Sequence, residues 1–145
     1  MPLPVQVLRA AKRPERMTNP VETILLVDDE ETVRRFSARV LAKHGFDVVS
    51  AASAQEALDA AHVRDDSIDL LMTDVMMPGM NGCQLAELLL ARKPSLRVLF
   101  ISGYAEDVLA TSVGLVPGAA FLGKPFKPKA LVTKVCEVLG MEQSS

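Results

Sequence analysis

The feature that most constrains the fold of this chain is an alternation of short apolar runs with longer amphipathic stretches, repeated five times after residue 22. The apolar runs are rich in Val, Ile and Leu at both odd and even positions, which is typical of strands covered by helices on both faces. The intervening stretches carry apolar residues at helical spacing. Strands that alternate with helices form βαβ units, so the sequence predicts an α/β fold with a doubly wound, five-stranded parallel sheet.

The expected strands lie in the segments ILLVDD, FDVVSA, IDLLMTD, LRVLFIS and AAFLGKPF. The expected helices cover residues 31–44, 53–61, 82–92, 106–112 and 127–139. The fourth helix is expected to be short because Gly114 and Pro117 are poor helix residues. Ser53 and Glu56 have the spacing of a capping box at the start of the second helix. On the third helix, the spacing predicts that one inward face carries Leu85, Leu88 and Leu89.

The two ends of the chain differ from this pattern. Residues 1–22 contain four prolines without a sustained period and are expected to be a flexible leader or linker, with at most a short strand at residues 5–8; residues 141–145 are expected to be a tail. The first 20 residues carry four basic residues and one acidic residue, although the whole chain has a net charge of −2. The folded body, residues 23–140, is therefore acidic, which argues against nucleic-acid binding by it.

The apolar runs and the cysteines indicate the cellular compartment of the protein. No apolar run is long enough to cross a bilayer, and the leader lacks the apolar region of a secretory signal, so we expect no membrane insertion. The chain has two cysteines, Cys83 and Cys136, without metal-like or redox-motif spacing. We expect them to be free thiols in a reducing compartment, which predicts a cytoplasmic protein. Cys83 is expected to be a small packing residue.

Polar residues gather where the expected strands end. Asp28 and Asp29 follow the first strand, Asp74 ends the third, Ser102 ends the fourth and Lys124 follows the fifth. Each alone has an ordinary explanation, such as a helix cap, a turn or a surface lysine. Together they are expected at one edge of the sheet, because the carboxyl ends of parallel strands lie side by side and ligands bind there.

The chemistry of such a group can be stated from its residue types. Carboxylate oxygens suit Mg²⁺, or Mn²⁺ in its place, together with a phosphate oxygen. Lys124 and Ser102 can pair with phosphoryl oxygens. A carboxylate can itself be the nucleophile that forms an aspartyl phosphate. The sequence therefore predicts that Asp74 accepts a phosphoryl group, and that the turn containing Pro78, Gly79 and Gly82 carries the backbone around the ion.

Four segments carry a resemblance to a known family. LLVDDE, TDVMMPGMNG, ISGY and FLGKPF, in this order and spacing, resemble the receiver domain of two-component response regulators over roughly residues 23–140. The residues of the last two segments are most similar to those of receivers in hybrid sensor histidine kinases. The resemblance implies a flavodoxin-like (βα)5 fold with strand order 2-1-3-4-5.

The resemblance also implies roles for individual residues. Asp74 would be the phosphoacceptor, and Mg²⁺ would be held by Asp29, Asp74 and the backbone carbonyl of Met76, with Asp28 acting mostly through water. Lys124 would pair with the phosphoryl group, and Ser102 would bond one of its oxygens. These roles are expectations that follow from the family motifs.

A switch and two tuning positions are implied as well. Phe121 stands where the family places an aromatic that turns inward as Ser102 moves, and as Phe it carries no hydroxyl. The Lys124–Pro125 peptide bond would be cis, which costs little only before proline. Met76, over the site entrance, and Tyr104 are candidates for tuning how easily water reaches the aspartyl phosphate, whereas Met77 is expected to be buried.

The resemblance implies a phosphoacceptor signalling module rather than an enzyme. Its donor would be a phosphohistidine on a histidine kinase or a histidine phosphotransfer protein. Because no output domain follows residue 140, the output is expected to be another protein, an attached kinase, or a change in oligomeric state such as a weak homodimer. A stand-alone receiver starting at Met17 and a domain of a hybrid kinase both remain open.

Two other functions compete with this interpretation. An aspartate-nucleophile phosphatase needs a second acid two residues after the nucleophile, and Met76 in that place cannot move a proton. A pseudo-receiver that binds partners without phosphorylation remains the alternative.

Overall fold

The computed structural model describes residues 21–64, 67–103, 116 and 118–141. The strands are β1 (Thr23–Val27), β2 (Asp47–Ala51), β3 (Leu70–Asp74), β4 (Arg97–Ser102) and β5 (Ala120–Gly123). The helices are α2 (Glu31–Lys43), α3 (Ala54–Arg64), α4 (Gly82–Arg92) and α6 (Pro128–Leu139). The predicted strand at residues 5–8, the helix at residues 106–112 and Tyr104 lie outside the described residues.

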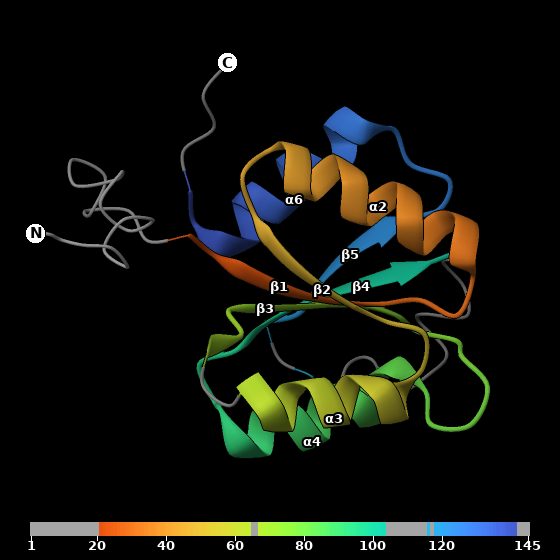
Figure 1. Ribbon diagram of the computed structural model, residues 1–145, viewed down its shortest axis with the longest axis vertical. Coiled ribbons are helices and arrows are strands. Elements are labelled where there is room, and N and C mark those ends of the chain that lie inside the picture. The colour runs from red at the N-terminus through yellow and green to blue at the C-terminus, as the bar shows by residue number, and fades with distance from the viewer. Residues whose placement is uncertain (1–20, 65–66, 104–115, 117, 142–145) are drawn as a thin grey trace, which may run out of the picture.

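The five strands form one parallel sheet in the order β2-β1-β3-β4-β5, which confirms the predicted topology. Helices α2 and α6 cover one face of the sheet, and α3 and α4 cover the other (Figure 1). Successive strand residues alternate between the two faces. Leu25 and Leu71 belong to the core under α3 and α4, whereas Ile24 and Leu70 belong to the core under α2 and α6.

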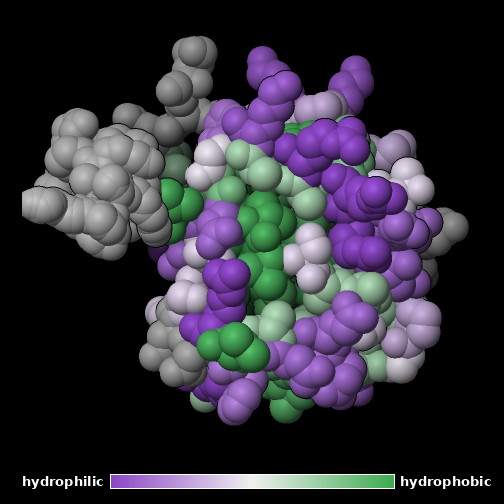
Figure 2. Space-filling model, viewed as in Figure 1, coloured by the Kyte–Doolittle hydropathy of each residue, from purple (hydrophilic) through white to green (hydrophobic). Residues whose placement is uncertain are grey.

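Strand β2 forms one edge of the sheet. Val48 packs against one core and Val49 against the other, and both are half-buried. Figure 2 shows this side of the molecule, with a hydrophobic band over β2 between the hydrophilic outer surfaces of the helices. The edge strand therefore lies away from the centre of the sheet, where the polar strand ends converge.

Local sequence signals explain three of the helix ends. At α3, Ser53 Oγ accepts the backbone N–H of Glu56 at 3.1 Å. The carboxylate of Glu56 in turn accepts the backbone N–H of Ala52 at 2.8 Å. At α4, Asn81 and Gln84 form a reciprocal capping box that the sequence analysis did not identify. At its C-terminal end, α6 stops at Gly140, which adopts a left-handed conformation with φ of 71°.

The prediction that Leu88 faces the core was wrong. Leu88 is 46% exposed, because the buried stripe of α4 is centred on Gly82, Ala86 and Leu89, and position 88 lies more than one-quarter turn from that line. On α2, Ser37 and Leu41 are buried, whereas Val33 and Phe36 are only half-buried.

Among the described residues, no helix has both the length and the hydropathy needed to cross a membrane.

Candidate functional site

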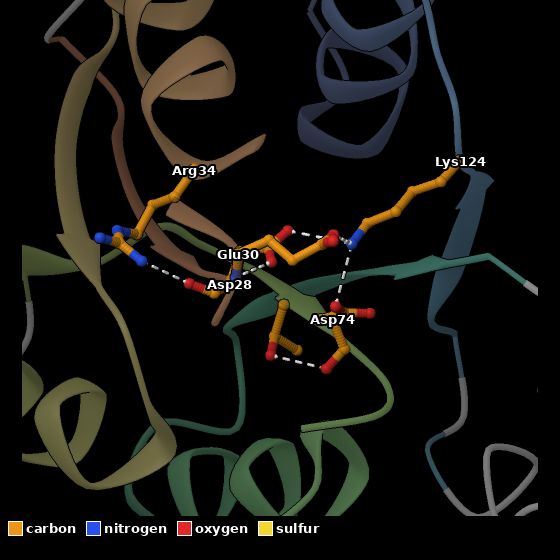
Figure 3. Close-up of polar contacts among 6 residues, drawn as sticks. Asp28, Glu30, Arg34, Asp74 and Lys124 are labelled. Carbon is orange, nitrogen blue, oxygen red and sulfur yellow. Dashed lines mark hydrogen bonds and ion pairs between the residues drawn. The ribbon is translucent and has the colours of Figure 1, made fainter. Parts of the chain in front are cut away.

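The carboxyl ends of the central strands bring the predicted polar residues to one edge of the sheet. Carboxylate oxygens of Asp28, Asp29 and Asp74 all lie within 4.8 Å of one another. The Nζ atom of Lys124 lies 3.1 Å from Asp74 Oδ2 and 3.3 Å from Asp28 Oδ2 (Figure 3). Ser102 ends the neighbouring strand β4, and its carbonyl oxygen accepts the backbone N–H of Lys124 at 2.8 Å. Residues far apart in the sequence thus meet because parallel strands end together.

Asp74 is held rigidly at the end of β3. Its backbone carbonyl accepts a hydrogen bond from Thr73 Oγ1 at 3.0 Å. The next residue, Val75, donates its N–H to the carbonyl of Ile101 on β4 at 3.0 Å, and its own carbonyl accepts the N–H of Gly82 at 2.9 Å. The side chain of Asp74 is only 10% exposed, so the carboxylate is presented at a fixed place with little water around it.

Asp28 links the site to the start of α2. Its Oδ1 accepts the backbone N–H of Glu30 at 2.9 Å, which satisfies a donor at the helix N-terminus. Its carbonyl oxygen accepts a hydrogen bond from Nη1 of Arg34 at 2.8 Å. The N-cap residue of α2 is Glu30, so Asp28 bonds the turn that leads into the helix and also belongs to the acidic group.

Burial and like charge shape the protonation of the site. Burial raises the pKa of Asp74 to about 6, and the charges of Asp28 and Asp29 add to this, although Lys124 works in the opposite direction. Burial also raises the pKa of Asp28. Burial would lower the pKa of Lys124, but the carboxylates of Glu30 and Asp74 raise it above its usual value. The site carries more negative charge than one ammonium group neutralises.

The donor set fits a small divalent cation. All three side chains offer carboxylate oxygens, which Mg²⁺ prefers. Asp28 and Asp74 are buried while Asp29 is exposed, so the oxygen atoms line a place that is open to solvent on one side. A cation there would stabilise the charged form of Asp74, whose pKa is raised by burial and further by the charges of Asp28 and Asp29.

The residues predicted to tune or switch the site follow the strands that end at this edge of the sheet. Met76, two residues after Asp74, has a side chain that is 56% exposed, and Met77 is buried as expected. Phe121, in β5, is partly exposed, and its ring stacks on buried Phe100 with a centroid distance of 5.6 Å. The Lys124–Pro125 peptide bond is cis.

Sequence reasoning missed the contacts that two residues make at this site. Glu30 was the last letter of a quoted motif, yet its Oε1 lies 2.9 Å from Lys124 Nζ. Its place directly after two aspartates, at the start of a predicted helix, was the available signal. Gly82 was assigned to a turn, but a methyl group on it would stand 2.2 Å from the carbonyl oxygen of Asp74. No local pattern reveals that contact.

Comparisons with known proteins agree with this geometry. The family model of the response regulator receiver domain matches residues 24–136. The chain is 40% identical over 117 residues to the sensor kinase CckA of Brucella abortus, covering 81% of this chain and 12% of that protein. It is 34% identical over 122 residues to the response regulator receiver protein CpdR of the same organism, covering 82% of this chain and 98% of CpdR.

Solved structures lead to the same family. The receiver domain of the hybrid histidine kinase CckA superposes with a TM-score of 0.70 at 38% identity, covering 81% of this chain and 98% of that one. A receiver domain protein from Clostridium thermocellum superposes with a TM-score of 0.74 at 26% identity, covering 83% and 95%. The sheet order, the acidic strand ends and the matched family together show that this chain belongs to the response regulator receiver domains.

Proposed function

We propose that this receiver domain takes a phosphoryl group from a phosphohistidine onto Asp74 and passes the resulting change of state to a partner. The observation that carries the proposal is the juxtaposition of a buried, rigidly held carboxylate with a lysine ammonium 3.1 Å away and two further aspartates. The donor would be a histidine kinase or a histidine phosphotransfer protein, in keeping with the family.

The transfer needs a nucleophile, charge neutralisation and control of water. A carboxylate oxygen of Asp74 would form the new bond to phosphorus as the bond to the donor's histidine nitrogen breaks, and that nitrogen keeps the electron pair. Lys124 would hold a phosphoryl oxygen through a charge-assisted hydrogen bond. The burial of Asp74 limits the water that can reach it. A bound Mg²⁺, held by Asp28, Asp29, Asp74 and the predicted carbonyl of Met76, would supply positive charge to the phosphoryl oxygens.

The same edge offers a route from the phosphoryl group to a surface. Ser102 lies at the end of β4, and its carbonyl accepts the backbone N–H of Lys124. Because of this hydrogen bond, a movement of either residue would displace the other. Phe121 on β5 is partly exposed and stacks on Phe100, which precedes Ser102 by two residues. A shift of Ser102 toward a phosphoryl oxygen would change the environment of Phe121, with Met76 and Tyr104 tuning the lifetime of the phosphate.

The relatives of this domain support two settings for it. CckA is a sensor kinase, of which this chain spans 12%, and CpdR is a receiver protein, of which it spans 98%. Both an attached kinase and a separate partner, including a second copy of the chain, are therefore candidate outputs. Cys83 and Cys136 are buried, and neither forms a disulfide within the described part of the chain, in keeping with a reducing, cytoplasmic setting. The domain would act as a substrate and switch, not as an enzyme on other molecules.

The proposal is tested by intact-mass spectrometry after incubation with a small phosphodonor, with and without Mg²⁺. We expect the wild type to gain one phosphoryl group only when Mg²⁺ is present, and the Asp74→Ala variant to gain none. Asp59→Ala is a matched control, because Asp59 is an exposed aspartate of α3 that bonds Gln55 away from the site. A wild type that gains nothing while binding Mg²⁺ would favour the pseudo-receiver.

A further inference from the structure

The nearest partner of the site lysine is neither of the aspartates that surround it. Glu30 Oε1 lies 2.9 Å from Lys124 Nζ, compared with 3.1 Å for Asp74 Oδ2 and 3.3 Å for Asp28 Oδ2. Figure 3 shows the Glu30 side chain extending from the start of α2 toward the ammonium group, opposite the side from which Lys124 arrives. An ammonium group has three donors, and three carboxylates surround this one.

Glu30 is placed there by its backbone. Its N–H is bonded to Asp28 Oδ1 at 2.9 Å, and its carbonyl accepts the N–H of Arg34 at 2.9 Å in the first turn of α2. The side chain itself is 61% exposed. Within the described part of the chain, its carboxylate has one ion-pair partner, Lys124. Glu30 therefore stands at the solvent rim of the site, held on an element that the fold has already fixed.

We propose that Glu30 is a positioning residue that competes with a phosphoryl group on Asp74 for the ammonium of Lys124. A phosphoryl group brings further negative charge and needs the donors of this lysine. Glu30 occupies one of those donors, and its own charge repels the incoming anion. The carboxylate thus holds one donor of Lys124 and weakens the phosphorylated state, so that the state is lost more readily when the donor is withdrawn. This inference rests on the proposed function.

Neutralising Glu30 is the direct test, with beryllofluoride as a stable mimic of the phosphoryl group. Its affinity is measured by titration at a Mg²⁺ concentration shown to saturate each variant, so that a change in metal affinity does not enter. We expect Glu30→Gln to bind beryllofluoride roughly two- to fivefold more tightly than the wild type, the size of one exposed ion pair. The gain should shrink as ionic strength rises.

Glu31→Gln is the matched control. It removes the same charge from the next residue, but Glu31 pairs with Arg35 at 3.1 Å on the exposed surface of α2. We expect its affinity for beryllofluoride to equal that of the wild type. A merely structural role of Glu30 would lower both the melting temperature and the affinity, whereas competition raises the affinity and leaves the melting temperature within the range of the Glu31→Gln variant.

The outcomes separate this inference from the proposed function. An affinity of Glu30→Gln that is unchanged, weaker, or raised equally by Glu31→Gln overturns the competition. If the wild type binds no beryllofluoride, or if Asp74→Ala binds it as well as the wild type does, the phosphoacceptor role of Asp74 fails, and the competition fails with it. Wild-type binding that is lost in Asp74→Ala, together with tighter binding by Glu30→Gln alone, supports both.

Discussion

Gly82 stands directly against the backbone of Asp74, so that a Cβ atom on it would meet the Asp74 carbonyl oxygen at 2.2 Å and its carbonyl carbon at 3.1 Å. The contact is with backbone, which cannot swing aside as a long side chain can. The same Gly82 donates its N–H to Val75 and begins α4. The absence of a side chain at position 82 therefore decides where the carboxylate at position 74 is presented.

We expect Gly82→Ala to damage both stability and phosphorylation. The added methyl must push β3 and α4 apart in a buried place, and overpacking of this kind costs about 1–3 kcal/mol. Chemical denaturation should show that loss, and mass spectrometry with a small phosphodonor should show slower uptake.

Gly103→Ala is the matched control for this change. Gly103 follows Ser102 at the same edge, but its Cβ would meet nothing within 4 Å. We expect little change in stability there. A Gly82→Ala protein as stable and as readily phosphorylated as the Gly103→Ala protein would refute the role assigned to the close contact.

Asp74→Asn should stabilise the protein when no divalent cation is present. The pKa of Asp74 is raised to about 6 in the folded protein from an ordinary 3.8, so the charged carboxylate disfavours the fold at neutral pH. The difference corresponds to at most about 3 kcal/mol, and we expect a gain of about 1–3 kcal/mol in the free energy of unfolding at pH 7 in EDTA.

The pH dependence of this gain has a definite sign. A carboxyl whose pKa is higher in the folded state binds its proton more tightly there, so the cost of its charge disappears as the pH falls through about 6 toward 4. The advantage of Asp74→Asn over the wild type should shrink over that range. Adding Mg²⁺ at pH 7 should raise the stability of the wild type more than that of the variant. An advantage that is independent of pH would contradict this account.

Met76→Asn should shorten the lifetime of the phosphorylated protein without a large loss of stability. The Met76 side chain is 56% exposed, so its removal costs little burial. An amide in its place can hydrogen-bond water near the phosphoryl group, where a thioether does so only weakly. The rate of phosphate loss after removal of the donor measures the effect, which we expect to be severalfold.

Met141→Asn is the comparison for Met76→Asn, because Met141 is another exposed methionine and follows α6, whose C-terminal end contacts Arg97 at the start of β4. That end of the molecule is opposite the site. Equal rates of phosphate loss in the wild type and Met76→Asn would remove Met76 from the control of water.

Ser37→Ala should stabilise the protein. Ser37 is fully buried on α2, and within the described part of the chain its Oγ has no hydrogen-bond partner. An unsatisfied buried hydroxyl costs about 1–3 kcal/mol, and alanine is also the better helix former. We expect a gain of about 1–2 kcal/mol by denaturant titration.

Ser53→Ala provides the opposite case. The Ser53 hydroxyl caps α3 by accepting the N–H of Glu56, so its loss should cost about 1 kcal/mol. If the two substitutions changed stability in the same direction, the distinction between a satisfied and an unsatisfied serine would fail.

The sequence by itself determined the order and kind of the elements, the doubly wound sheet and the strand ends at which polar residues gather. These follow from signals within a few residues: apolar runs, helical spacing, and carboxylates such as Asp74 that end a buried run. The family motifs added the strand order, which the structure confirms. Local periodicity was a weaker guide to which side of a helix is buried, as Leu88 shows.

Only the tertiary structure decided how the site is supported. Glu30 and Lys124 are 94 residues apart, and their contact exists because the carboxyl ends of β1 and β5 and the start of α2 meet at one edge. The approach of Gly82 to the Asp74 carbonyl depends on how closely α4 returns to β3. Sequence patterns report which residue types an element needs. The distances between side chains on different elements are decided by how those elements pack, and no local pattern encodes them.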